Sequence, residues 1–385
     1  MRPIYLDHNA TTPVDPDVLN AMLPFLQQDF GNPSSSYALG KRARDAIETA
    51  RAQVADLIGA ASDEVIFTSG GTESSNIAIR GGAKSSHPRT TIVTTTIEHP
   101  ATDACCDLLK REGYELRRVK AGPDAIVDPE DFRTLVDSAT ALVTVIHAQN
   151  EIGTLQPIAE ISAISKAHGA LMHADAAQSA GKVPVDVKKM GVDLLSMAGH
   201  KLYAPKGIGA LYMRRGINLN SIIVGAGQEH GRRPGTENVA GIVALGEACR
   251  LAAGHLDAGA KHMRELTTAL LAKLRAGIPE IVLVGNPDRR LPNTLNVLFP
   301  DVSGRTLLES CPRVFASNGS ACHADREEAS AILTAIGLDP DAALGAVRLS
   351  VGRNSTIEDV EIAAASLIAA FRLLRQNSGA LIPAL

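Results

Sequence analysis

Short apolar segments alternate with helix-like segments along most of this chain, and this alternation restricts its fold more than any other feature. Residues 39–58 carry apolar side chains at helical spacing and stop at Gly59, a residue type that commonly follows a helix in the left-handed conformation. Short apolar or β-branched runs, separated by helical patterns, then occur at residues 64–67, 91–93, 141–146, 171–172 and 193–195. This spacing predicts βαβ units and an α/β fold with a mostly parallel sheet.

The pattern changes near Gly254, where a smaller unit is expected to begin. A long helix is predicted for residues 262–276, followed by strand-like runs at 281–284 and 295–299. A chain of 385 residues is too long for one small core and suits one large and one small domain. The predicted division is a large domain of residues 15–255 and a smaller α+β domain formed by residues 1–14 and 256–385.

The chain is predicted to close on a helix from Ile357 to Arg375. Ser355 and Glu358 stand three residues apart in front of it, which is the spacing of a capping box. Arg372 and Arg375 suit its last turn, because cations are favoured at the carboxyl end of a helix. The expected N-cap residue of this helix is therefore Ser355.

Charge and composition argue against several kinds of partner. A net charge of -4 and a sequence pI near 6.3 give no reason to expect nucleic acid or an anionic membrane surface. No segment approaches the roughly 18 uninterrupted apolar residues that a membrane-spanning helix needs, and no basic start with a leading apolar segment is present. We therefore expect a cytoplasmic protein.

The five cysteines indicate neither a disulfide framework nor a zinc ribbon, because five is an odd number and no CxxC spacing occurs. Cys322 lies in a run of small residues, Ser317 to Ala321, that suits an accessible loop. No metal site is predicted. The other cysteines sit in apolar or helical contexts and are expected to be packed side chains: Cys105, Cys106, Cys249 and Cys311.

Four predicted strands deliver polar side chains to one edge of the sheet. In open α/β folds ligands bind beyond the carboxyl ends of the strands, and these strands are followed by His99, Asn150, Asp175 and Lys201. One polar residue at such a place is commonly a solvated loop residue. Four of them together indicate a binding or catalytic site.

Residues 66–80 contain an element suited to bind an anion. A predicted strand ends in Thr68-Ser69-Gly70-Gly71-Thr72, and a helix follows at once. Glycines let backbone N–H groups approach a ligand, and the amino terminus of a helix favours negative charge. The chain has no Walker A pattern and no GxGxxG after its first strand, so the sequence indicates one phosphate group and no nucleotide polyphosphate.

One phosphate, a lysine and an aspartate at neighbouring strand ends suit pyridoxal 5′-phosphate. A lysine amine forms a Schiff base with this cofactor, and a buried carboxylate keeps the pyridine nitrogen protonated so that the ring accepts electrons. Lys201 ends a strand-like run and follows His200, whereas Lys206 lies in a Pro-Lys-Gly turn and is expected to be exposed. Lys201 is therefore the predicted Schiff-base lysine.

The chain resembles the cysteine desulfurases of the NifS/IscS type, which are PLP enzymes of fold type I in the class V aminotransferase family. The resemblance covers nearly the whole chain and implies the PLP-dependent transferase fold, with a large and a smaller domain. The segments that carry it are YLDHNATTP (5–13), GNPSS (31–35), FTSGGTESSN (67–76), EHPA (98–101), QNEIGTLQPI (149–158), HADAAQSAGK (173–182), GHKLYAPKGIGALY (199–212), RPGTEN (233–238), SNGSACHA (317–324) and VRLSVGR (347–353).

This resemblance implies a role for each matching residue around the cofactor ring. Lys201 would hold the cofactor covalently and act as the base at the substrate Cα. Asp175 would bind the pyridine nitrogen, and Gln178 would bind the phenolic oxygen. His99 would stack on the ring and take part in proton transfers.

The resemblance also implies how the phosphate is held. Gly71, Thr72 and His200 would bind it, joined by Thr236 of a neighbouring subunit. A homodimer is therefore expected.

For the substrate, the resemblance implies that Asn150 and Arg348 bind the carboxylate of L-cysteine. Cys322 would be the nucleophile, because a thiolate can attack the substrate sulfur and leave alanine and a persulfide on the protein. The sulfur would then pass to an acceptor protein such as a scaffold or a sulfur carrier. The implied process is iron–sulfur cluster assembly or thio-modification.

Some residues depart from the desulfurase pattern and leave alternatives open. Ala198 stands where a phosphate-binding serine is common, and Cys322-His323-Ala324-Asp325 is closer to the selenocysteine lyases of animals. A selenocysteine lyase acting on L-selenocysteine is the main alternative. An aminotransferase, or a PLP-binding scaffold protein without activity, is a more distant one.

Overall fold

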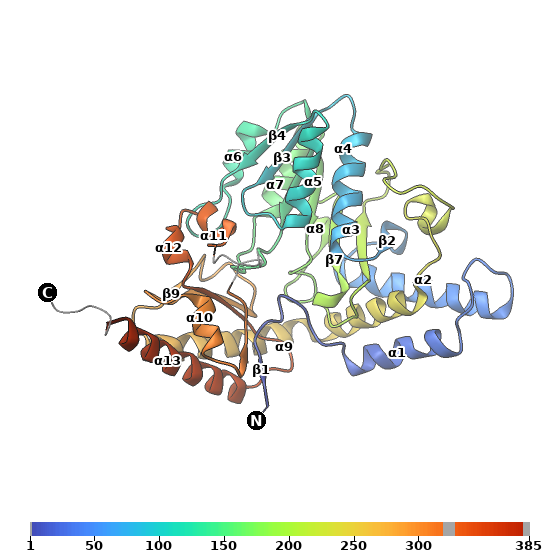
Figure 1. The fold of residues 1–385 in the computed structure, drawn as a ribbon. Helices are drawn as coiled ribbons and strands as arrows, with labels where there is room; N and C mark the ends of the chain where they lie inside the picture. The colour runs from blue at the N-terminus through green and yellow to red at the C-terminus, as the bar shows by residue number, and fades with distance from the viewer. Residues whose placement is uncertain (1, 319–327, 380–385) are drawn as a thin grey trace.

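A seven-stranded sheet forms the centre of the larger part of the molecule (Figure 1). The computed structural model describes residues 2–318 and 328–379 of the chain. In spatial order the strands are β2 (Val65–Thr68), β8 (Gly209–Met213), β7 (Leu194–Ala198), β6 (Leu171–Asp175), β5 (Thr140–Ile146), β3 (Thr91–Thr95) and β4 (Glu115–Val119). Neighbouring strands from β7 to β4 run parallel, and β8 pairs antiparallel with both β7 and β2. The predicted α/β fold with a mostly parallel sheet is confirmed.

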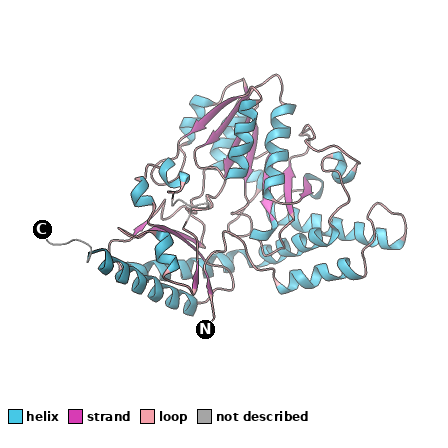
Figure 2. Ribbon diagram, viewed as in Figure 1, coloured by secondary structure: helices cyan, strands magenta, loops and turns pink. Residues whose placement is uncertain are grey.

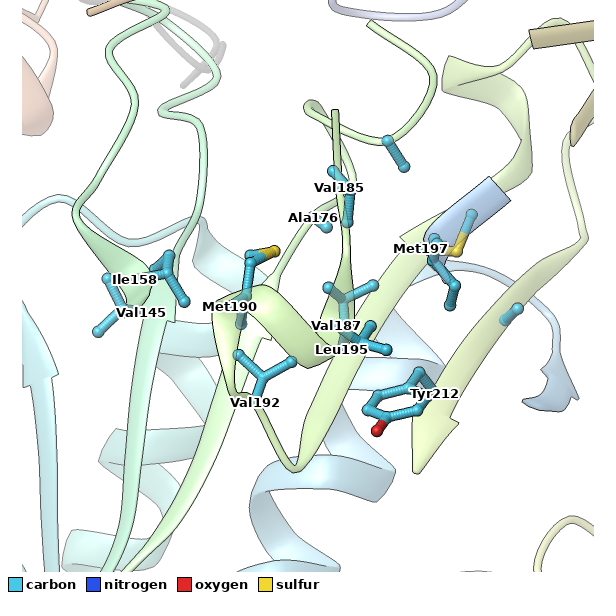
Figure 3. Packing of buried hydrophobic residues seen from close by; sticks show 14 of the residues in the cluster. Val145, Ile158, Ala176, Val185, Val187, Met190, Val192, Leu195, Met197 and Tyr212 are labelled. Carbon is cyan, nitrogen blue, oxygen red and sulfur yellow. The ribbon is translucent and has the colours of Figure 1, made fainter. Parts of the chain in front are cut away.

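Burial on both faces explains why the central strands are apolar throughout. Every residue of β3, β5 and β7 is buried. Successive side chains alternate between the faces, so Val145 and Leu195 pack in one cluster (Figure 3) while Leu142 and Leu194 pack in another. The alternation gives the sheet two separate hydrophobic faces, and each needs a layer of helices.

Helices supply those two layers (Figure 2). Their buried side chains assign each of them to a face of the sheet. One face is covered by a π-helical turn (Ile77–Gly81), α4 (Gly82–Ser85) and α5 (Pro100–Arg111), and α3 (Gly71–Asn76), which leads into that turn, contacts α5. The other is covered by α1 (Pro16–Gln27), α2 (Ala38–Ile58), α6 (Pro129–Leu135), α7 (Ile158–Ala167), α8 (Val187–Met190) and the first half of α9 (Val239–Gly277).

A smaller sheet and its helices form the rest of the described structure. The second half of α9 and α13 pack against this sheet, and Leu6 at the amino end of the chain joins the same cluster. The strand order is β12-β10-β9, all antiparallel, and β1 pairs parallel with β11. The elements are β1 (Ile4–Tyr5), β9 (Val282–Leu283), β10 (Thr294–Leu298), α10 (Gly304–Glu309), β11 (Val314–Phe315), α11 (Ala331–Ala335), α12 (Pro340–Ala343), β12 (Ala346–Ser350) and α13 (Ile357–Gly379).

The helix predicted for residues 262–276 is much longer than expected, because α9 starts at Val239 with Asn238 as its N-cap. Gly254 does not interrupt it, since the helix continues with its apolar side chains packed against α1, α2 and α13. The predicted boundary at residues 255 and 256 therefore falls inside one helix, and the domain division stays a prediction. By length and composition alone α9 could cross a membrane, but half of its most apolar stretch is buried within the protein, as in a core helix.

The cap of α13 also differs from the prediction. The N-cap is Thr356, whose Oγ1 accepts from the backbone N–H of Asp359 at 3.1 Å, while the Asp359 carboxylate accepts from the Thr356 N–H at 2.9 Å. Ser355 accepts instead from the Gly352 N–H at 2.9 Å. The helix extends past Arg375 to Gly379. The capping box is therefore one residue later than Ser355 and Glu358.

Candidate active site

The carboxyl ends of β3, β5, β6 and β7 border a cavity of about 390 Å³. This is the sheet edge at which the sequence predicted a ligand. The predicted site residues that line it are Gly71, Thr72, His99, Asn150, Asp175, Gln178, His200, Lys201 and Arg348.

Lys201 reaches the cavity from a 3₁₀ turn, Gly199–Lys201, directly after β7. Its Nζ donates to the backbone oxygens of Ala10, at 2.8 Å, and of Asn9. Burial and the nearby charge of Arg348 lower the pKa of Lys201 to about 8, although Asp175 acts in the opposite direction. Lys206, by contrast, is exposed, as predicted.

Asp175 ends β6 and is buried at the floor of the site. Its Oδ1 accepts from the Ala177 N–H at 2.9 Å, and burial raises the pKa of this carboxyl while His99 and Lys201 lower it. Within the described parts of the chain, no salt bridge involves Asp175. A cationic partner in the cavity would therefore be the group that keeps it ionised.

His99 is the N-cap of α5, directly before Pro100. Its Nδ1 accepts from the Ala101 N–H at 3.1 Å, so the proton of the neutral ring lies on Nε2. Burial lowers the pKa of His99 and favours this neutral form. The predicted start of a helix at Pro100 is confirmed.

The helical run from Gly71 to Ser85 begins at the cavity, and its first residues Gly71 and Thr72 form one part of the lining. A Cβ atom on Gly71 would lie 3.3 Å from the Cβ of Ala198, so glycine keeps this end open. His200 lies there too, with Nδ1 3.1 Å from Thr11 Oγ1, and burial lowers its pKa to about 4. Thr236 is exposed and does not line this cavity, so its predicted action on a neighbouring subunit stays a prediction.

Arg348 on β12 brings a buried guanidinium group to the cavity. Its Nη2 donates to Asp7 Oδ1 at 2.7 Å, and its Nη1 donates to the backbone oxygen of Asn150 at 3.1 Å. Among the described residues its buried Nε has no hydrogen-bond partner. A donor left unpaired in this way suits a ligand carboxylate.

Gln178 is held by residues that the sequence analysis did not single out. Its Nε2 donates to the backbone oxygen of Asn9 at 2.9 Å, and its Oε1 accepts from Lys182 Nζ at 2.9 Å. Asn9 and Ala10 line the cavity, and Lys182 lies behind Gln178. Their position inside the matching segments YLDHNATTP and HADAAQSAGK could have indicated that Asn9, Ala10 and Lys182 belong to the site.

Cys322 and His323 lie outside the described residues. The residues on either side contact the substrate end of the site: Ser317 pairs with Arg348 through two backbone hydrogen bonds, and Ser330 donates to Glu151. The other cysteines are buried, as predicted, and burial raises the pKa of Cys105 to about 11 and of Cys249 to about 12. These thiols are therefore poor nucleophiles near neutral pH.

The chemistry of the cavity fits pyridoxal 5′-phosphate. An amine with a lowered pKa can react with the cofactor aldehyde, and a buried carboxyl that forms no salt bridge among the described residues can take its ring nitrogen. The open helix start at Gly71 leaves room for its phosphate. Lys201, Asp175 and Gly71 thus supply complementary groups for three parts of one molecule.

Comparison with known proteins agrees with this chemistry. A family model described as aminotransferase class-V matches residues 4–362. The chain is 43% identical over 361 residues to the cysteine desulfurase IscS of Methanosarcina thermophila. The match covers 93% of this chain and 89% of that protein.

Two solved structures are similar over nearly their full lengths. A NifS-like protein has a TM-score of 0.90 and 35% identity, over 97% of this chain and 99% of that one. SspA in complex with cysteine has a TM-score of 0.79 and 34% identity, over 91% of this chain and 99% of that one. The chain therefore belongs to the class V aminotransferase family, among the pyridoxal 5′-phosphate-dependent cysteine desulfurases of the NifS/IscS type.

Proposed function

We propose that this protein removes sulfur from L-cysteine, releases L-alanine and passes the sulfur to an acceptor protein. The observation that carries the proposal is that one cavity is lined by the Lys201 amine, the Asp175 carboxyl and the Arg348 guanidinium. The relatives named cysteine desulfurase support the reaction, and the similar structure that holds cysteine supports the substrate.

Bound pyridoxal 5′-phosphate supplies an electron sink for the bonds at the substrate Cα. Arg348 binds the substrate carboxylate through its guanidinium, and Asn150 contributes its side-chain amide beside it. Lys201 takes the Cα proton, since a pKa of about 8 leaves part of its population neutral near pH 7. Asp175 would bind the ring nitrogen and hold the proton there.

Cys322 is proposed to receive the sulfur. Its thiolate attacks the substrate Sγ, so that a new S–S bond forms and the substrate Cβ–Sγ bond breaks. The electron pair of the broken bond stays with the substrate carbon skeleton, which takes up a proton and leaves as alanine. The persulfide on Cys322 is the form in which sulfur is passed to a scaffold or sulfur-carrier protein, for iron–sulfur cluster assembly or thio-modification.

The selenocysteine lyase alternative is not favoured. The relative from Methanosarcina thermophila is named cysteine desulfurase, although Ala198 and the residues after Cys322 depart from the usual desulfurase pattern. Both substrates have the same carboxylate and amino groups for Arg348 and Lys201 to recognise. The two activities are therefore separated by measuring turnover of L-cysteine and of L-selenocysteine.

A cytoplasmic homodimer without membrane or nucleic-acid partners is also proposed. A net charge of -4 gives no support for binding to nucleic acid or to an anionic membrane surface, and the partial burial of α9 supports a core role for this helix. The exposed position of Thr236 is compatible with a role in a second subunit.

The test is alanine and sulfide release from L-cysteine in the presence of a thiol reductant. In Cys322→Ala we expect cofactor absorbance to be retained and sulfide release to fall to near background, because the attacking thiolate is missing. Cys311→Ala is the matched control, since Cys311 is a buried thiol, and it should release sulfide as the unaltered protein does. Undiminished release from Cys322→Ala would contradict the assigned role of Cys322.

A further inference from the structure

A buried lysine stands behind the cofactor cavity and has no role in the proposed reaction. The side chain of Lys182 is almost fully enclosed, at 6% exposure, in the turn that follows β6. Burial lowers its pKa well below the ordinary value, and the charges of Lys201 and Arg348 act in the same direction. Burying a lysine costs free energy unless hydrogen bonds compensate for the lost water, so the partners of Lys182 indicate what it does here.

Lys182 donates to the oxygen atoms of two side-chain amides. Its Nζ lies 2.9 Å from Gln178 Oε1 and 3.2 Å from Asn9 Oδ1. The two ends of an amide are nearly alike in shape and differ only in that one donates and the other accepts hydrogen bonds. In either protonation state the Lys182 amino group has an N–H for each of these two oxygen atoms, so Lys182 holds the accepting end of both amides toward itself.

For Gln178 this fixes which end is presented to the cofactor cavity. Gln178 lines the cavity, whereas Lys182 does not. With Oε1 held by Lys182, Nε2 is the end left to donate, and in this structure it donates to the backbone oxygen of Asn9 at 2.9 Å. A donor at this place suits the phenolic oxygen of the cofactor, which carries negative charge.

For Asn9 the same arrangement links several parts of the site. Its Oδ1 also accepts from Asn293 Nδ2 at 3.0 Å, and its Nδ2 donates to Thr294 Oγ1 at 2.8 Å and to the backbone oxygen of Asn150 at 3.3 Å. Its backbone oxygen accepts from the Nζ of Lys201. Asn9 is therefore placed by Lys182 and Asn293 on one side, and it contacts the Schiff-base lysine on the other.

We propose that Lys182 is a positioning residue of this enzyme, which turns the donating end of the Gln178 amide toward the phenolic oxygen of the cofactor and steadies Asn9 beside Lys201. Lys182 touches neither cofactor nor substrate and acts through these two amides. The inference rests on the proposed function for its cofactor, but it does not depend on the identity of the sulfur substrate.

The measurable consequence is the pH midpoint of the visible absorption band of the lysine-bound cofactor. The negative phenolic oxygen stabilises the protonated nitrogen that joins Lys201 to the cofactor. A hydrogen bond donated to this oxygen weakens that stabilisation, so loss of the donor raises the midpoint. In Lys182→Met the amide is free to turn, and we expect the midpoint to rise by about one pH unit, as for one hydrogen bond to a charged group.

Lys182→Gln is the matched control. Its neutral amide can still donate to Gln178 Oε1, so the midpoint should stay near that of the unaltered protein. A shift as large as that of Lys182→Met would show that the charge of Lys182 acts directly, and this would overturn the proposal. If Lys182→Met fails to fold, Lys182→Gln still tests the proposal, because a midpoint raised by about one pH unit in this variant would overturn it.

A double-mutant cycle tests whether the effect passes through Gln178. In a Gln178→Ala background, Lys182→Met should move the midpoint by less than half as much as in the unaltered protein. An equal shift in both backgrounds would overturn the proposal. The same cycle can be read by denaturant unfolding of the cofactor-free protein, where coupling between the two positions is expected and simple additivity would count against it.

These measurements separate the two proposals from each other. The midpoint is recorded without L-cysteine, so a protein that shows the predicted shifts but releases no sulfide would refute the proposed function alone. A protein that desulfurates L-cysteine but shows no shift in Lys182→Met would refute the role of Lys182 alone.

Discussion

Lys201 and Asp175 respond to the same buried cavity in opposite directions, and both shifts favour the neutral form. Burial lowers the pKa of the Lys201 amine and raises the pKa of the Asp175 carboxyl. A bound ring with a protonated nitrogen would offset the second shift, because an adjacent cation stabilises the carboxylate. The Lys201 amine, in turn, can react with an aldehyde at a pH where an exposed lysine is almost fully protonated.

The rate of cofactor uptake by the cofactor-free protein should therefore depend on the pKa of Lys201. Only the neutral amine attacks the aldehyde, so below pH 8 the rate should rise about tenfold per pH unit and then level off near pH 8. Stopped-flow absorbance during reconstitution gives this profile. A rate that keeps rising toward pH 10 would mean that the amine keeps its ordinary pKa, and Lys201→Arg is the control that should form no covalent adduct.

Several chemistry-bearing residues were predictable from the residues alone because they end or follow a strand, whereas Arg348, inside β12, and Gln178 were predicted only from the family resemblance. Lys201, Asp175 and His99 all stand at such places, where parallel strands end at one edge. Asn9 was missed because it contacts Lys201 through a backbone oxygen, which every residue possesses. Lys182 was missed because a lysine gives no sign in the sequence that it is buried.

At the scale of the elements, burial favoured prediction but did not decide it, since the fully buried strands β8 and β12 were not predicted. The runs that became β3, β5 and β7 are buried along their whole length, and all three were predicted. The edge strand β4 was not, because its exposed or half-buried residues Glu115, Arg117 and Arg118 look like a charged loop. Pairing with β3 overrides that composition, with Arg117 held by Glu115 and Asp137.

The start of α13 shows how a local motif can be assigned one residue too early. Ser355 with Glu358 and Thr356 with Asp359 both have the spacing of a capping box. Asp359 is buried and bonded to Thr356, whereas Glu358 is exposed. Tertiary packing of the helix decides between two registers that the sequence leaves equal.

This assignment predicts a difference in stability between two substitutions. Thr356→Ala should lower the free energy of unfolding by about 1 kcal/mol, because the N–H of Asp359 loses its acceptor. Glu358→Gln, the control, should change it by less than about 0.5 kcal/mol, as for other exposed positions. Denaturant unfolding measures both changes. A larger loss of stability in Glu358→Gln than in Thr356→Ala would instead support Ser355 as the N-cap.

At the scale of the whole molecule, one segment carries Thr236, the residue on which the proposed homodimer depends. Residues 214–238 link β8 to α9, and Glu229 anchors them inside the protein. Its carboxylate accepts from two nitrogens of Arg51 and from the Phe67 N–H, each at 2.8 Å. Thr236 follows this anchor and remains exposed. A firmly anchored segment that presents an exposed hydroxyl suits a role outside its own subunit.

The proposed homodimer predicts complementation between two defective subunits. Thr236→Ala should weaken cofactor binding about tenfold, by loss of one hydrogen bond to a phosphate. When Thr236→Ala and Lys201→Ala subunits are mixed, each mixed dimer has one site with an intact Lys201 and the neighbour's intact Thr236. Absorbance titration should therefore recover full affinity at that site. Mixing Thr236→Ala with a Lys201→Ala/Thr236→Ala double variant, the control, should recover nothing. If Thr236 acts within its own subunit, neither mixture recovers, because every site that keeps Lys201 still lacks the hydroxyl.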